Sequence, residues 1–98
     1  MNINLYTKFN IGDKFYTVKT ICKPNNHKMK VIKHVIEEPF VVKDMEITYI
    51  ISDSYDTKEN ITYSGENENG DILNRTSHLC FYTLADAEAY AKWYNENN

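Results

Sequence analysis

The clearest strand pattern in the chain is the nine-residue stretch MEITYIISD, residues 45–53. Its side chains alternate between apolar and polar, and the apolar ones are Met45, Ile47, Tyr49 and Ile51, with Ile50 as the exception. Successive side chains of a β-strand point to opposite faces of the sheet. The stretch therefore predicts a strand with one buried and one exposed face, which is typical of an antiparallel sheet.

Two β-rich runs precede this strand. Residues 14–22 follow a turn at residues 9–13, in which Gly12 is the residue able to adopt a positive φ. Residues 28–37 carry apolar side chains on both faces, as expected for a strand covered on both sides. The polar run at residues 23–26 and the Glu38-Pro39 pair are expected to end these two strands.

Shorter strands are predicted at residues 60–65, 71–74 and 78–81. Asn69-Gly70 lies between the first two and predicts a hairpin with a type I′ turn, in which both central residues have positive φ. A helix is predicted over residues 83–95, because Thr83 and Asp86 have capping-box spacing and an apolar stripe follows. The stripe consists of Leu84, Ala87, Tyr90, Ala91 and Tyr94, and Trp93 lies about 60° outside it.

Together these elements predict one domain over residues 1–98. Its fold class is α+β: a small, strongly curled antiparallel sheet of about five strands over residues 14–81, closed like a partly open barrel, with one C-terminal helix. A chain of 98 residues has enough surface to bury one core, but too little for a core and a deep cleft as well.

The composition and the charge distribution indicate which kinds of protein this chain can be. The composition is globular, and the formal net charge is −3. The charge is uneven, because residues 1–50 carry eight Lys against five acids, while residues 51–98 carry three basic residues against nine acids. No apolar run has the length of a membrane span or a leader, so a cytoplasmic location is expected. Cys22 and Cys80 are predicted to be buried free thiols in a reducing compartment.

No catalytic, cofactor or metal site is predicted. The three histidines, His27, His34 and His78, have no triad pattern around them, and the glycines form no phosphate-binding loop. Cys22, His27, His78 and Cys80 offer four zinc-binding side chains, but their spacing differs from that of a zinc knuckle. The sequence therefore predicts a protein that is not an enzyme.

The acidic stretch at residues 53–71 is the main candidate for a binding surface. Its carboxylates, interleaved with tyrosines, are suited to docking on a basic protein partner by charge complementarity. The candidate contact residues are Asp53, Tyr55, Asp56, Glu59, Tyr63, Glu66, Glu68 and Asp71, with Trp93 as an aromatic anchor. The alternative is that these residues are ordinary solvated loop surface. Homo-oligomerisation through Trp93 is also left open.

A second candidate surface is basic. Lys23, Lys28, Lys30 and Lys33 cluster near His27 and would suit a nucleic acid. Lysines also protect exposed strand edges against pairing with another sheet, so an edge strand is the alternative explanation.

Two segments carry a resemblance to known proteins. The sequence FNIGDKFY, residues 9–16, resembles the opening of small SH3-like barrels, and FYTLADAEAY, residues 81–90, resembles the helix that ends many short uncharacterised proteins of low-GC bacteria and their prophages. The resemblance implies an adaptor or inhibitor, here an accessory protein of a phage or mobile element. It carries over no functional residue.

Overall fold

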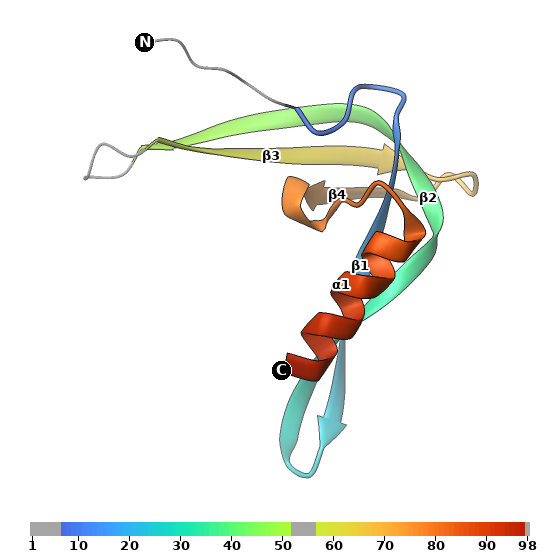
Figure 1. The fold of residues 1–98 in the computed structure, drawn as a ribbon, viewed down its shortest axis with the longest axis vertical. Helices are drawn as coiled ribbons and strands as arrows, with labels where there is room; N and C mark the ends of the chain where they lie inside the picture. The colour runs from blue at the N-terminus through green and yellow to red at the C-terminus, as the bar shows by residue number, and fades with distance from the viewer. Residues whose placement is uncertain (1–6, 52–56, 98) are drawn as a thin grey trace.

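The computed structural model describes residues 7–51 and 57–97 (Figure 1). They form strands β1 (Lys14–Asn25), β2 (Lys28–Ile51), β3 (Thr57–Glu66) and β4 (Ile72–Thr76), then a short 3-10 helix η1 (Ser77–Leu79) and the helix α1 (Leu84–Asn97). The strands form one antiparallel sheet in the order β1-β2-β3-β4. The predicted α+β class, with an antiparallel sheet and a C-terminal helix, is therefore confirmed.

The sheet differs from the prediction in its strand count and closure. The predicted strands at residues 28–37 and 45–53 are one 24-residue strand, β2, as far as residue 51, and residues 52 and 53 lie outside the described residues. β2 pairs with β1 along its first half and with β3 along its second. The sheet is open, so the prediction of a strongly curled barrel is wrong. The predicted strand at residues 78–81 is replaced by η1 and a bridge, in which Tyr16 and Phe81 exchange two hydrogen bonds of 2.8 Å.

Pro39 was predicted to end a strand but lies within β2. The register shows why the strand accepts it. Phe15 pairs with Phe40 and Thr17 with Ile36, so three residues of β2 lie opposite Tyr16 alone. Such a bulge interrupts the ladder, and a proline without an N–H is tolerated there. At this bulge β2 changes direction, and the β1–β2 and β2–β3 hairpins then run different ways (Figure 1).

The core lies where the two halves of β2 meet the other strands. Its buried side chains are Phe9, Phe15, Phe40, Val42, Ile61, Tyr63 and Cys80. Gly65 permits this packing, because a Cβ at that position would lie 2.7 Å from the Phe15 ring and 2.8 Å from the Cβ of Phe40. The buried Thr17 hydroxyl donates a 2.6 Å hydrogen bond to the carbonyl of Leu79, which ties η1 to β1.

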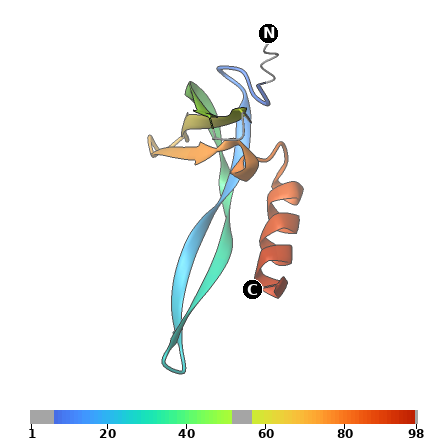
Figure 2. The same ribbon diagram turned by 90° about the vertical axis from the view of Figure 1, so that its left-hand side faces the viewer.

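Both the helix cap and its buried stripe match the prediction. The Thr83 hydroxyl accepts a hydrogen bond of 3.1 Å from the N–H of Asp86, as an N-cap residue does. Ala87 and Ala91 are buried against the sheet, while Trp93 is 58% exposed. Helix α1 covers one face of the β1–β2 hairpin, and the hairpin extends past the C-terminal end of the helix (Figure 2).

Candidate functional site

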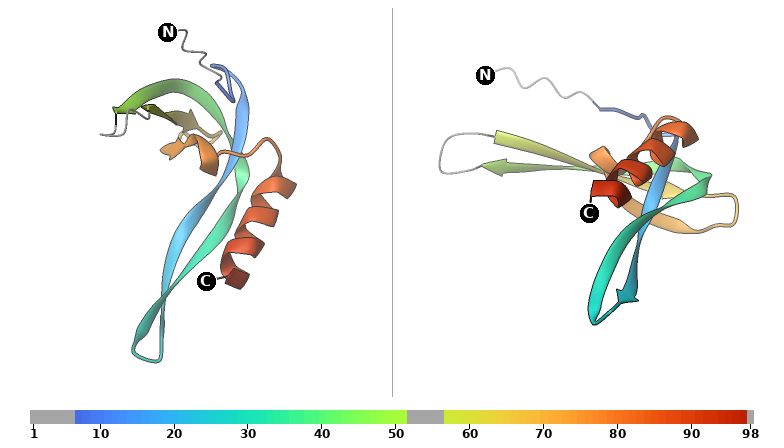
Figure 3. Two further views of the ribbon diagram at one scale, coloured as in Figure 1. Left: turned by 60° about the vertical axis from the view of Figure 1, so that its left-hand side comes forward. Right: turned by 60° about the horizontal axis from the view of Figure 1, so that its bottom comes forward.

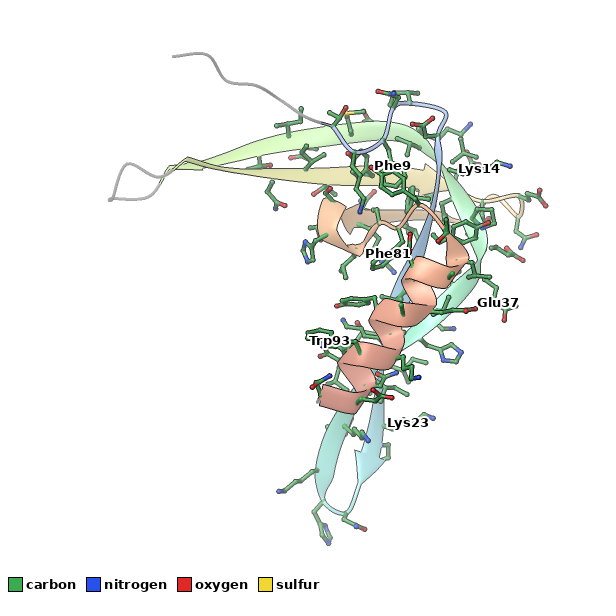
Figure 4. All side chains as sticks on the ribbon, in the orientation of Figure 1. Phe9, Lys14, Lys23, Glu37, Phe81 and Trp93 are labelled. Atoms are coloured by element: carbon green, nitrogen blue, oxygen red, sulfur yellow. The ribbon has the colours of Figure 1, made fainter. Side chains whose placement is uncertain are left out.

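The structure does not gather the predicted acidic contact residues into one surface. Asp53, Tyr55 and Asp56 lie outside the described residues, and of Glu59 only the backbone is described, on β3. Glu66, Glu68 and Asp71 lie at the β3–β4 turn. Trp93 lies on α1, on the opposite side of the helix from Glu37 in Figure 4.

Tyr63 corrects the prediction, because it belongs to the core instead of to a contact surface. Its side chain is fully buried, and its ring lies edge-on to Phe9 at 5.4 Å. The hydroxyl accepts hydrogen bonds from the N–H groups of Lys8 at 2.9 Å and Phe9 at 3.2 Å. A buried tyrosine with a satisfied hydroxyl is a packing residue.

The β3–β4 turn is organised by Asn67. Its side-chain oxygen accepts hydrogen bonds from the N–H groups of Asn69 at 3.0 Å and Asp71 at 2.9 Å. Gly70 donates to the carbonyl of Asn67 and has a φ of 83°, whereas Asn69 has no positive φ. The hairpin is where the sequence predicts it, but the type I′ turn is wrong: the loop is a tight turn followed by a left-handed glycine.

One glutamate that the sequence analysis left out joins this turn. The carboxylate of Glu38 accepts hydrogen bonds from the side-chain amides of Asn67 at 3.4 Å and Asn69 at 3.1 Å. Glu37 precedes it in β2 and is exposed. We call Glu38, Glu66, Glu68 and Asp71 the acidic ridge. The β2 bulge brings its two halves together across about 30 residues of sequence, and no local pattern predicts that contact.

The hairpin formed by β1 and the first half of β2 is the second candidate site, and we call residues 19–34 the arm. It closes through Asn26 and His27, whose φ angles are 46° and 70°. Asn25 pairs with Lys28, so β1 continues beyond Cys22, where the sequence predicted its end. Two positive φ angles in a two-residue loop match the right-handed twist of the strands and hold the arm extended.

The two faces of the arm differ in chemistry, because β-strand side chains alternate. One face carries Lys19, Lys23, Lys28, Lys30 and His34, and we call it the lysine face. The opposite face lies against α1, since Val18 is buried and the Lys33 ammonium lies 5.0 Å from the Tyr94 ring centroid. Beyond the helix that face is exposed, including Met29 at 65% and Val31 at 36%.

The arm carries no carboxylate. From Lys14 to Ile36 the chain has six lysines and two histidines but neither Asp nor Glu. Lys23 and Lys30 are direct cross-strand partners. Figure 3 shows the arm pointing away from the β2–β3 and β3–β4 hairpins, so the basic and acidic regions of the chain lie apart in space.

An aromatic row runs along one flank of α1. Phe81 and Tyr90 have ring centroids 5.3 Å apart, and Tyr90 and Trp93 are 6.3 Å apart. Phe81 begins the row beside Tyr16 on β1, and Trp93 ends it on the flank of the helix shown in Figure 4. Trp93 was predicted to lie outside the buried stripe, and its exposure confirms this.

The cysteines and histidines do not form a metal site. Cys22 is exposed on the arm, so its predicted burial is wrong, whereas Cys80 is buried as predicted. Burial raises the pKa of the Cys80 thiol from 9.0 to about 11, and the charges of Lys8 and Arg75 oppose this rise. Within the described residues, no three His, Cys, Asp or Glu side chains lie close enough together to hold a metal ion.

Comparisons with protein-family models, curated proteins and solved structures find no match to this chain. Across residues 7–51 and 57–97, neither helix has the length and apolar character needed to span a membrane.

Proposed function

We propose that this protein is a non-enzymatic binding module whose arm engages a nucleic acid through the lysine face. The observation that supports this proposal is the arm itself, a projecting two-stranded hairpin with several lysines and no carboxylate. A two-stranded β-ribbon fits the major groove of a duplex, and lysines paired with phosphates release counterions on binding.

The pairing of Lys23 with Lys30 adds a physical argument. Like charges directly opposite each other destabilise a β-hairpin. The arm also projects beyond the helix, so few tertiary contacts offset that repulsion. A bound anionic ligand neutralises the repulsion between Lys23 and Lys30. The lysine pair would therefore favour the bound state of the arm over the free state.

A titration of fluorescent DNA tests the proposal. Duplex and single-stranded probes are titrated with the wild-type chain and with the triple variant Lys23→Glu, Lys28→Glu, Lys30→Glu. The matched control is Lys14→Glu, Lys43→Glu, Lys92→Glu, which makes the same change in net charge at exposed lysines outside the arm.

We expect the arm variant to lose binding and the control variant to keep most of it. The logarithm of the wild-type affinity is expected to fall linearly with the logarithm of salt concentration. Equal losses of DNA affinity in the two variants would mean that binding depends only on net charge, and this would contradict the assignment to the arm.

The acidic ridge supports a second candidate function, the docking of a basic protein partner. Glu38 binds the β3–β4 turn through two side-chain amides, so the ridge is held as one surface. This arrangement, together with the resemblance to small SH3-like adaptors and inhibitors of low-GC bacteria and prophages, supports a role as a phage or mobile-element accessory protein.

An immobilised arginine-rich peptide tests the ridge. We expect Glu66→Lys, Glu68→Lys, Asp71→Lys to abolish retention while the melting temperature stays nearly unchanged. Asp86→Lys, Glu88→Lys, Glu96→Lys is the matched control, since these exposed acids lie on α1. Retention by the ridge variant would show that the ridge is ordinary solvated surface.

A further inference from the structure

The free edge of β1 is open over a short stretch of the arm. Tyr16 uses its outward N–H and carbonyl to pair with Phe81. In a β-strand every second residue directs these groups to the same edge, so Val18, Thr20 and Cys22 also face outward. The Nε of Arg75 donates to the carbonyl of Val18 at 3.3 Å, which confirms this alternation.

Both ends of the open stretch are closed. Phe81 occupies the edge at Tyr16, and Pro24, the next outward residue after Cys22, has no N–H to offer. Between them, within the described part of the chain, no hydrogen bond reaches the outward backbone groups of Thr20 and Cys22. The carbonyl of Val18 is occupied by Arg75, so the open edge consists of Thr20 and Cys22.

The neighbouring strand has its edge covered at the same level. The side-chain oxygen of Asn95 accepts a hydrogen bond from the N–H of Lys33 at 2.8 Å, and its amide nitrogen donates to the Lys33 carbonyl at 2.9 Å. Lys33 is the cross-strand partner of Thr20. The helix thus covers the β2 edge at Lys33 and leaves the β1 edge open directly across the hairpin.

The aromatic row lies beside the open edge. Residues 93 and 95 lie about 160° apart around a helix. Because Asn95 reaches the β2 edge, Trp93 projects from the opposite flank, on the side of β1. The row runs from Phe81, which bridges to Tyr16, to Trp93, two residues before Asn95 on α1.

We propose that the β1 edge from Thr20 to Cys22 binds an extended peptide in which acidic and apolar residues alternate. The peptide adds a strand and pairs with the outward groups of Thr20 and Cys22. Its apolar side chains lie on the helix side, against Tyr90 and Trp93. Its acidic side chains lie on the other side, next to Lys19 and Lys23.

Charge selects this ligand over a second copy of the chain. Two copies paired through β1 would bring Lys19 and Lys23 against the same residues of the partner copy, and like charges across a strand pair repel. The absence of Asp and Glu from residues 14–36 makes the edge complementary to an acidic strand instead. This site shares Lys19 and Lys23 with the lysine face, but it pairs through the β1 edge, which the nucleic acid proposal does not use. Proline variants at that edge therefore test it separately.

A matched pair of proline variants tests the site. Cys22 and Val31 are cross-strand partners, and both direct their N–H outward, Cys22 to the β1 edge and Val31 to the β2 edge. Cys22→Pro and Val31→Pro each remove an outward N–H without removing a hydrogen bond between β1 and β2. The probe is a fluorescent peptide that alternates Glu with Val and Phe, beside a peptide of the same composition in which the Glu residues form one block.

We expect Cys22→Pro to weaken binding of the alternating peptide about tenfold and Val31→Pro to leave it nearly unchanged. Trp93→Ala is expected to weaken it, whereas Ile72→Ala, at an exposed apolar residue of β4, is not. Amide hydrogen exchange on the unmodified chain gives a readout independent of variants: the peptide should protect the N–H groups of Thr20 and Cys22 but not that of Val31.

Three results would overturn the proposal. Equal binding of the alternating and block peptides would mean that the peptide binds through its total charge and not as an added strand. Equal effects of the two proline variants, or protection at Val31, would move binding away from the β1 edge. A concentration-dependent dimer that Cys22→Pro dissociates would assign the edge to a second copy.

Discussion

The side chain of Asn95 binds the backbone of Lys33 as a neighbouring strand would. It accepts the N–H at 2.8 Å and donates to the carbonyl at 2.9 Å, across 62 residues of sequence. The carboxamide has the same donor and acceptor as a peptide group, so it completes the ladder of an edge strand. This contact anchors the last turn of α1 to the arm.

Removing this contact should destabilise the fold measurably. Asn95→Ala leaves two backbone groups of Lys33 without a partner, and we expect the free energy of unfolding to fall by about 1–2 kcal/mol. Urea denaturation followed by circular dichroism measures the change. Glu96→Ala, at the next and exposed residue, is the control and should change stability by less than about 0.5 kcal/mol. Similar losses in the two variants would contradict a specific role for Asn95.

Gly65 should be intolerant of any side chain. A Cβ there would lie within 2.8 Å of the Phe15 ring and of Phe40, so we expect Gly65→Ala to cost about 2–3 kcal/mol through overpacking. Gly70→Ala is the contrast, since its Cβ meets nothing within 4 Å and only its φ of 83° is unfavourable. We expect that variant to cost about 1 kcal/mol. Thermal unfolding compares the two, and a smaller loss at Gly65 would contradict the close packing.

The turn of the arm should accept glycine with a gain in stability. His27 has a φ of 70°, which is unfavourable for any residue with a Cβ. His27→Gly is therefore expected to stabilise the arm by about 0.5–1 kcal/mol, as seen in slower amide exchange at Lys23 and Lys30. His34→Gly makes the same replacement within β2 and should destabilise by about 1 kcal/mol. Faster exchange in His27→Gly would contradict the turn geometry.

The two thiols should differ in reactivity and in their effect on pH stability. A thiol reagent at pH 8 should modify the exposed Cys22 quickly and Cys80 only after unfolding. The pKa of Cys80 is raised in the folded state to about 11, so folding favours its protonated form. Its contribution to stability is thus full below the unfolded pKa near 9 and is lost as the pH rises from about 9 to 11.

The measurement is denaturant unfolding at several pH values, with Cys80→Ala as the control. Below pH 9 that variant should be less stable, because it loses a buried side chain, but it should lack the Cys80 part of the decline above pH 9. Parallel stability curves for the two proteins would contradict the raised pKa.

Local pattern was enough for the strand alternation from residue 45, for the helix and for the outward position of Trp93. It was not enough for the extent of the strands, because residues 23–25 and 38–44 are also strand and residues 78–81 do not form one. Apolar residues repeat every second position at residues 45–53 and with helical spacing from Leu84 to Tyr94. Both repeats are local properties of the sequence. Thr83 and Gly12 were predicted for the same reason, since capping and positive φ depend on a few neighbouring residues.

Sequence alone was sufficient to identify the helix, the antiparallel type of sheet and the distribution of lysines and acids along the chain. Only the three-dimensional structure shows that residues 28–51 form one bent strand. It also shows that Tyr63 is buried and Cys22 exposed, the reverse of what was expected. Finally, it shows that Asn95 covers one edge of the arm while the other stays open. These features depend on the register between strands and on contacts between residues far apart in the chain. The local spacing of apolar residues does not predict such contacts.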